Sequence, residues 1–233
     1  MRTTSTAVAT ALVCVATGFA LAGCSDGAAP PEPSAAELLD RANETMKALT
    51  SVTVDWTYTG AVAVAGQSGH MTTDLKDTCA TRMTWAGAGT YEQIRIGDTA
   101  YARSEGASPK GAVAKLAGAE AGKRWTKIPV DKETAELGPT SCAQEFASFG
   151  TATKGGPTEV GGTPAISLVV TDKADKGSTY TFHIATEGEP YILKVAYEGP
   201  EHRTTTTYSA FDRPLDVRPP AAADVRDANA AGG

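Results

Sequence analysis

The spacing of apolar residues along the chain first predicts a helix. Apolar side chains recur at helical intervals from Leu38 to Leu49, which places them on one face of a helix. Ser34 and Glu37, just before this stripe, have the spacing of a capping box at a helix start. The pattern therefore predicts an amphipathic helix over about Ala35–Ala48.

Most of the remaining chain has a period of two, which predicts antiparallel strands separated by polar or glycine-containing turns. The clearest alternation runs from Val52 to Tyr58. Further strands are predicted at Ala61–Ala65, Met71–Lys76, Thr81–Trp85, Tyr91–Ile96, Ala100–Arg103, Arg124–Ile128, Ala165–Thr171, Ser178–Ala185, Tyr191–Tyr197 and Arg203–Ala210, with a last edge strand at Pro214–Val217. A loop is expected over Ser104–Gly122, and a second helix at Cys142–Phe149.

This order of elements predicts one α+β domain over residues 34–219, with one helix before a long antiparallel sheet and another inserted within it. Three segments flank the domain. We expect a lipoprotein signal peptide at 1–23, a flexible tether rich in proline at 24–33, and a disordered tail at 220–233.

The first segment has the features of a targeting signal. Arg2 is followed by a stretch without charge from Ala7 to Ala22, and this stretch ends in Leu21-Ala22-Gly23-Cys24. The four residues resemble the bacterial lipobox, which implies cleavage before Cys24 and a diacylglyceryl group on its thiol. Two acyl chains suffice for stable anchoring. We therefore expect a protein lipid-anchored through Cys24 on the extracytoplasmic face of the cell membrane; an ordinary secretory signal with a chance cysteine is the alternative.

Two further cysteines, Cys79 and Cys142, are predicted to form a disulfide, because they are an even pair in an oxidising compartment. The alternative is a metal site. It is disfavoured because the histidines, His70, His183 and His202, do not lie at metal-ligand spacing from either cysteine.

Motifs for catalysis are absent from the sequence, which has no nucleophile elbow, phosphate-binding loop or zinc-protease pair. We therefore expect a protein that is not an enzyme and that uses no cofactor or metal. The net charge of −6 argues against nucleic acid as a partner.

A series of loose motifs, taken in order after the lipobox and the helix, resembles a known family. The motifs are Ser51–Val54, Gly97–Arg103, Arg124–Ile128, Val160–Ala165, Pro190–Val195 and Phe211–Pro220. Their order resembles that of the actinobacterial LppX/LprG-type lipoproteins, which are similar in fold to LolA and LolB. The likeness covers roughly residues 34–220.

The resemblance implies a curved antiparallel sheet that forms a half-open barrel, with helices packed on its concave face. In this family the space between sheet and helices holds lipid acyl chains. The leading hypothesis is therefore a monomeric envelope lipoprotein that binds or carries a lipid or another apolar ligand. The alternative is a non-catalytic cell-surface interaction or sensor domain with a closed core, since alternation alone does not separate a filled core from an open pocket.

The ligand-binding hypothesis assigns two walls to the site. The helix contributes Leu38, Leu39 and Met46. The inward-facing positions of the sheet are expected to be Val54, Trp56, Ile94, Phe182, Ile184 and Leu193.

Overall fold

The computed structural model describes residues 32–60, 66–106, 122–130 and 141–227. All of them except Glu32 belong to a compact unit that begins at Pro33. The predicted signal peptide, most of the tether, the predicted strand at 61–65 and most of the predicted loop at 104–122 lie outside the described residues.

The predicted first helix is confirmed as α1, Ala35–Lys47. Both halves of the capping box form, because the Ser34 hydroxyl accepts from the Glu37 amide while the Glu37 carboxylate accepts from the Ser34 amide. These bonds satisfy two amides that would otherwise lack partners at the helix start. The buried face of α1 carries Leu39, Ala42 and Met46.

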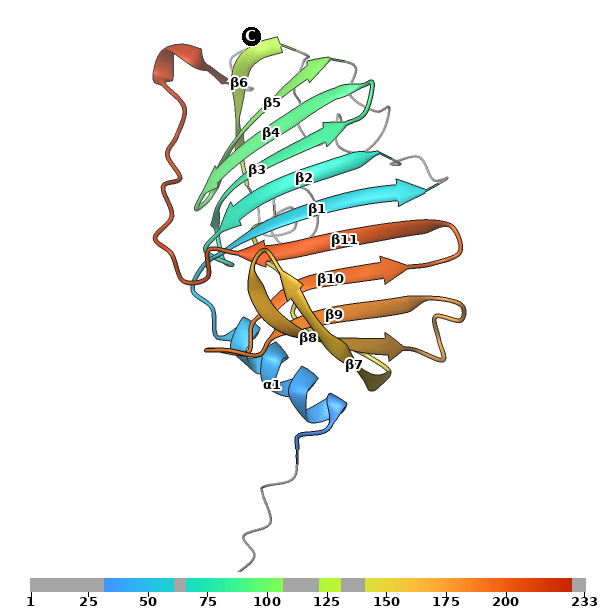
Figure 1. The fold of residues 1–233 in the computed structure, drawn as a ribbon. Helices are drawn as coiled ribbons and strands as arrows, with labels where there is room; N and C mark the ends of the chain where they lie inside the picture. The colour runs from blue at the N-terminus through green and yellow to red at the C-terminus, as the bar shows by residue number, and fades with distance from the viewer. Residues whose placement is uncertain (1–31, 61–65, 107–121, 131–140, 228–233) are drawn as a thin grey trace, which may run out of the picture. The chain divides into compact units, whose positions relative to one another are not determined.

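Twelve strands of the described residues form one sheet (Figure 1). Their bounds are β1 (Val52–Gly60), β2 (Gln67–Thr73), β3 (Thr78–Trp85), β4 (Gly89–Ile96), β5 (Thr99–Gly106), β6 (Gly122–Pro129), β7 (Thr151–Val160), β8 (Thr163–Thr171), β9 (Thr179–Ala185), β10 (Ile192–Glu198), β11 (His202–Ser209) and β12 (Val225–Asp227).

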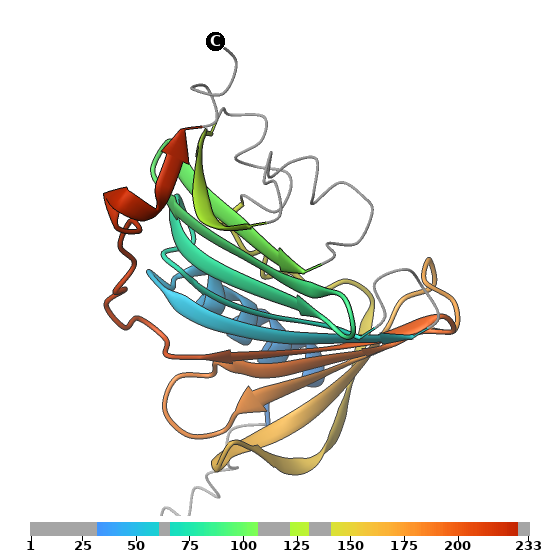
Figure 2. The same ribbon diagram turned by 90° about the horizontal axis from the view of Figure 1, so that it is seen from above.

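The sheet consists of two runs of consecutive strands that join where β1 pairs with β11. Its order is β12-β6-β5-β4-β3-β2-β1-β11-β10-β9-β8-β7, and every pair is antiparallel except β12 with β6. β12 and β7 are the two edges, so the sheet is not closed. Figure 2 shows its curvature.

α1 packs on one face of the sheet, against β7, β9 and β10. We call this face the inner face and the opposite one the outer face. The main core cluster lies between α1 and the inner face, where it joins Leu39 and Met46 to Val54, Phe182 and Ile184. The α+β class and the large curved antiparallel sheet agree with the sequence prediction, although α1 is the only α-helix among the described residues.

The predicted helix at Cys142–Phe149 is wrong. Residues 141–149 form an irregular segment, which we call the strap. Eight residues are too few for a helix that is stable by itself. Tertiary bonds instead hold the strap, since the Thr73 hydroxyl donates to the Cys142 carbonyl and the Asn43 amide donates to the Ser148 hydroxyl, at 2.5 and 2.8 Å.

The sequence prediction also missed β7, which contains Gly155, Gly156 and Pro157, residue types that favour turns. The strand accommodates them by a register shift between Lys154 and Pro157. Such irregularities, and proline itself, are tolerated on edge strands. A true two-residue turn follows, where Gly161 and Gly162 both have positive φ between the paired ends of β7 and β8.

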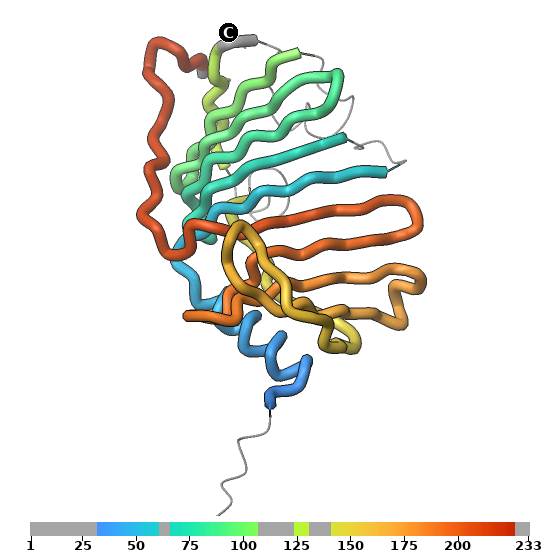
Figure 3. Tube along the Cα trace, viewed as in Figure 1, coloured from blue at the N-terminus to red at the C-terminus, as the bar shows by residue number. Residues whose placement is uncertain are grey.

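The end of the described chain differs from prediction as well. Pro214–Val217 is not a strand, and residues 222–227 are not disordered: Ala222–Asp224 is a 3-10 helix and Val225–Asp227 is β12. Figure 3 shows the segment after β11 running past the ends of the β1–β5 strands to the β6 edge. There β12 adds to the sheet in parallel with β6.

Candidate ligand-binding face

Most of the predicted lining residues lie together on the inner face. Leu39, Met46, Val54, Phe182 and Ile184 are buried in the main cluster. Leu38 and Trp56 are partly buried and pack against it. The Met46 side chain is 0% exposed and that of Ile184 is 1% exposed, so this part of the inner face is a filled core under α1.

Ile94 does not belong to this group. β4 turns Tyr91, Gln93 and Arg95 to the inner face, opposite the buried Met83, Thr81 and Cys79 of β3. Ile94 therefore points to the outer face, beside Ala80 and Tyr101. The prediction assigned Ile94 to the inner face because it is apolar, but in β4 polar side chains occupy the buried positions.

Leu193 is also on the outer face, in a separate small cluster with Ala165 and Ala185. The cause is a register shift between Ile192 and Lys194, which places one extra residue in β10. A bulge of this kind reverses the alternation on one side of it. Ile192, next to it, packs in the main cluster instead.

Trp56 connects the main cluster to a second one. It is partly buried and packs against both. Its ring lies over Gly69, the residue opposite it on β2, where a Cβ atom would come within 2.0 Å of the ring. Any other residue at position 69 would force the Trp56 ring away from its present position on the inner face.

The second cluster lies on the β3–β5 part of the inner face, where α1 makes no substantial contact. Its buried members are Met83, Trp85, Tyr91 and Ala102, and Ile128 packs against them. Burial raises the pKa of the Tyr91 hydroxyl above its ordinary value. That hydroxyl donates a 2.7 Å hydrogen bond to the Gln93 side-chain oxygen. Sequence reasoning did not assign these residues, although the alternation from Thr81 to Trp85 places Met83 and Trp85 on one face.

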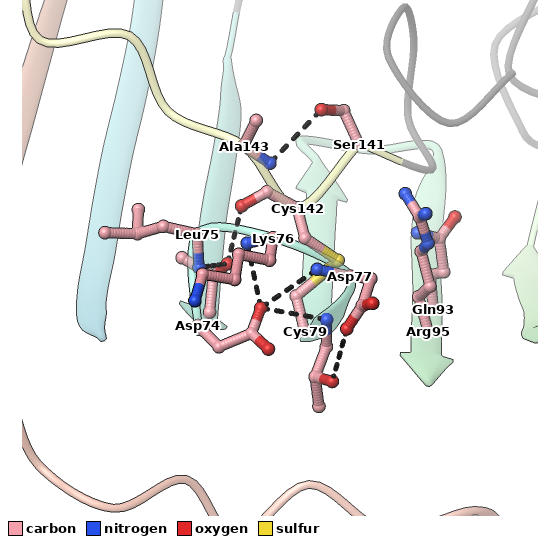
Figure 4. The surroundings of a disulfide bond; sticks show 12 residues. Asp74, Leu75, Lys76, Asp77, Cys79, Gln93, Arg95, Ser141, Cys142 and Ala143 are labelled. Carbon is pink, nitrogen blue, oxygen red and sulfur yellow. Dashed lines mark hydrogen bonds between the residues drawn. A yellow bond between two sulfur atoms is a disulfide. The ribbon is translucent and has the colours of Figure 1, made fainter. Parts of the chain in front are cut away.

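The Cys79–Cys142 disulfide predicted from the sequence is present and belongs to the main cluster on the inner face. It attaches the strap to β3, and both cysteines are fully buried. Figure 4 shows Gln93 and Arg95 beside it, consistent with the register that sets Arg95 opposite Cys79.

The end of the strap lines a pocket with the β8–β9 part of the inner face. The pocket has a volume of about 220 Å³. Val170, Tyr180 and Phe182 lie on the sheet side, and Phe149 on the strap side. Phe149 is 75% exposed, and it is the one large apolar side chain in the described residues that is exposed. Asp172 and Asp175 also line this pocket.

The outer face offers little chemistry. A shallow site of about 400 Å³ is lined mostly by hydroxyl and charged side chains, including Asp55 and His70, which pair at 2.7 Å and are half exposed. His183 lies mid-strand on this face. Burial, with Lys194 opposite it, lowers its pKa. Among the described residues there is no group of three or more side chains arranged to hold a metal ion.

The curved sheet and the one α-helix among the described residues are consistent with the LolA-like class of fold. Within it, the chain is similar to the lipoprotein LppX of Mycobacterium tuberculosis, with a TM-score of 0.53 and 18% identity over 78% of this chain and 98% of that one. It is likewise similar to LprF of Mycobacterium bovis, with a TM-score of 0.57 and 12% identity over 81% and 97% of the two chains. The family resemblance inferred from the sequence is thereby confirmed at the level of the fold.

At this identity the likeness establishes the fold alone. No protein-family model matches the sequence, and no curated protein does. No helix among the described residues is long and apolar enough to cross a membrane.

Proposed function

We propose that the protein is an envelope lipoprotein that binds the apolar chains of a lipid or similar amphiphile on the inner face of its sheet. One observation carries the proposal. The apolar surface of the inner face continues through Trp56 to the second cluster, beyond the strands that α1 packs against. The fold shared with LprF and with the lipoprotein LppX supports it.

Cys24 supplies the membrane attachment in this proposal, through the acyl chains that its lipobox implies. The tether to Pro33 lets the domain stand away from the bilayer. A Cys24→Ala change is then expected to release the folded protein into the medium. If that variant stays on membranes, the proposed lipid anchor is refuted, but the proposed ligand binding is not affected.

Binding is tested by a series of fatty acids of increasing length. Each buried methylene contributes about 0.8 kcal/mol, so each added methylene should tighten binding roughly fourfold. The full chain carrying Cys24→Ser is the right sample, because it brings no acyl chain of its own. An affinity that does not depend on chain length contradicts the proposal.

Variants locate the bound chain. Met83 is 8% exposed and faces inward from β3, while its neighbour Thr84 is exposed on the outer face. Met83→Gln is expected to weaken binding about tenfold or more, and Thr84→Gln to leave it unchanged. Equal effects of the two variants would place the ligand elsewhere.

A second candidate function keeps the core closed and meets a partner protein at the cell surface. The observation in its favour is the tight packing under α1, where the side chains of Met46, Val54 and Ile184 are at most 2% exposed. In that case no fatty acid of any length binds, and the exposed Phe149 beside its pocket is the apolar feature available to a partner.

A further inference from the structure

Three polar atoms on the inner face of β3 and β4 are buried without a hydrogen-bond partner among the described residues. They are the Thr81 hydroxyl oxygen, the Trp85 indole nitrogen and the Gln93 side-chain nitrogen. The three side chains are 8%, 6% and 1% exposed. The indole and the amide are hydrogen-bond donors, and the hydroxyl can donate.

Such a group of atoms is costly for a folded chain. A buried donor without a partner destabilises a protein by roughly 1–3 kcal/mol, and more than nine in ten buried polar groups have partners. Three in adjacent strands on one face therefore require an explanation that the packing of the described residues does not supply.

The side chains are placed to meet one ligand group. Thr81 and Gln93 are directly opposite each other on β3 and β4. Side chains in such a pair have Cβ atoms about 5 Å apart. The Tyr91 hydroxyl donates to the oxygen of the Gln93 amide, which fixes the amide so that its nitrogen remains for another acceptor.

The neighbouring strand leaves room beside this pair. β5 presents Ala100, Ala102 and Ser104 to the inner face, opposite Arg95, Gln93 and Tyr91 in that order. All three β5 side chains are small, so the longer side chains of β4 rise above them. Arg95 is 6% exposed and donates from Nε to the Gly97 carbonyl, so it adds a buried cation to the same face.

We infer that Thr81, Gln93 and Trp85 bind the oxygen acceptors of a polar head group, such as phosphate or sugar oxygens, on an amphiphile whose chain lies along the second apolar cluster. Trp85 belongs to both parts, because its ring packs in that cluster while its indole N–H lacks a partner. The inference rests on the proposed binding of an amphiphile and adds the chemistry of its head group.

Three dodecyl compounds test the head group on the full chain carrying Cys24→Ser. Dodecyl phosphate and dodecyl maltoside carry oxygen acceptors, whereas dodecyltrimethylammonium has the same chain and no acceptor in its head. The net charge of −6 would by itself favour the ammonium compound. We expect the phosphate or the maltoside to bind at least tenfold more tightly than the ammonium, by calorimetric titration below micelle formation.

A matched pair of substitutions gives the sharper readout. Thr81→Val keeps the side-chain shape and removes the unpartnered oxygen, while Thr84→Val makes the same change on the outer face of the same strand. For Thr81→Val we expect dodecyl phosphate affinity to fall roughly 10-fold or more, while the ligand-free Tm rises by a few degrees. Thr84→Val should change neither.

Each other outcome has a definite meaning. If Thr81→Val lowers the Tm and leaves affinity unchanged, its hydroxyl has a partner within the chain and the inference is overturned. Gln93→Leu gives an independent check by the same two measurements. Equal binding of all three dodecyl compounds overturns the head-group inference but leaves the proposed function intact, whereas no binding of any of them contradicts both. Inorganic phosphate binding as tightly as dodecyl phosphate indicates a free anion as ligand and also overturns the inference.

Discussion

The Cys79–Cys142 disulfide cross-links the strap to β3, so its removal is a direct test of how the inner face is held together. The perturbation is the double substitution Cys79→Ala, Cys142→Ala. Both sulfur atoms are fully buried, and the bond spans a sequence separation of 63 residues.

The magnitude follows from the loop that the bond closes. In the chain-entropy model a loop of this length restricts the unfolded state by about 4 kcal/mol. For a domain of this size, 1 kcal/mol corresponds to about 2–4 °C in Tm. We therefore expect the double variant to unfold about 8–16 °C below the parent protein. Truncation of the two buried side chains acts in the same direction.

The assay is thermal unfolding followed by circular dichroism, with and without dithiothreitol. The parent should lose stability on reduction by a similar amount, and the double variant should not respond to reductant. A Cys14→Ser, Cys24→Ser background removes the other two thiols and should keep the full response. A loss of stability below about 1 kcal/mol would mean that the hydrogen bonds to Thr73 and Asn43, and not the disulfide, hold the strap.

Three further predictions concern single residues. Gly69→Ala should destabilise the protein by about 1–3 kcal/mol in urea unfolding, because its Cβ would overlap the Trp56 ring, whereas Gly156→Ala, with open space around it, should not. Ser34→Ala should cost about 1 kcal/mol in the same assay, since it removes the helix cap, and an unchanged midpoint would contradict that role. Burial raises the pKa of Tyr208 from 10.0 to about 12, so the contribution of its neutral hydroxyl to stability is complete below pH 10 and is lost as the pH rises towards 12. Tyr208→Phe should reduce this alkaline loss of stability by about 2–3 kcal/mol. An identical dependence of stability on pH in the variant would contradict the assignment.

The elements that could be predicted from sequence are those whose pattern is local. α1 has its cap and its apolar stripe within one short segment, and β1 alternates without interruption. The disulfide was predictable from the compartment that the lipobox implies. In each case the residues that determine the structure are adjacent in sequence or are of a type with few alternatives.

The errors arose where distant contacts decide the structure. The strap is irregular because its backbone bonds go to Thr73 and its sulfur to Cys79, and neither is nearby in sequence. β12 is ordered by pairing with β6, about 100 residues earlier. A local pattern carries no information about such partners.

In the candidate site, the sequence pattern also assigned two residues to the wrong face of the sheet. Ile94 was assigned inward because apolar residues usually are, but β4 buries Gln93 and Arg95 and turns Ile94 outward. Leu193 was misplaced by one extra residue in β10. Polar residues at buried positions break the rule on which alternation rests, and such exceptions are expected at functional sites.

Photo-crosslinking is the sharpest test of whether the inner face holds an apolar chain. A fatty acid with a diazirine near the end of its chain would be bound to the full chain carrying Cys24→Ser, irradiated, and the labelled peptides identified by mass spectrometry. We expect labels on the β3–β4 segment, at Met83, Trp85 or Tyr91, and their loss in competition with unlabelled fatty acid. Labels confined to outer-face residues such as Thr84, or no label that competes, would contradict it.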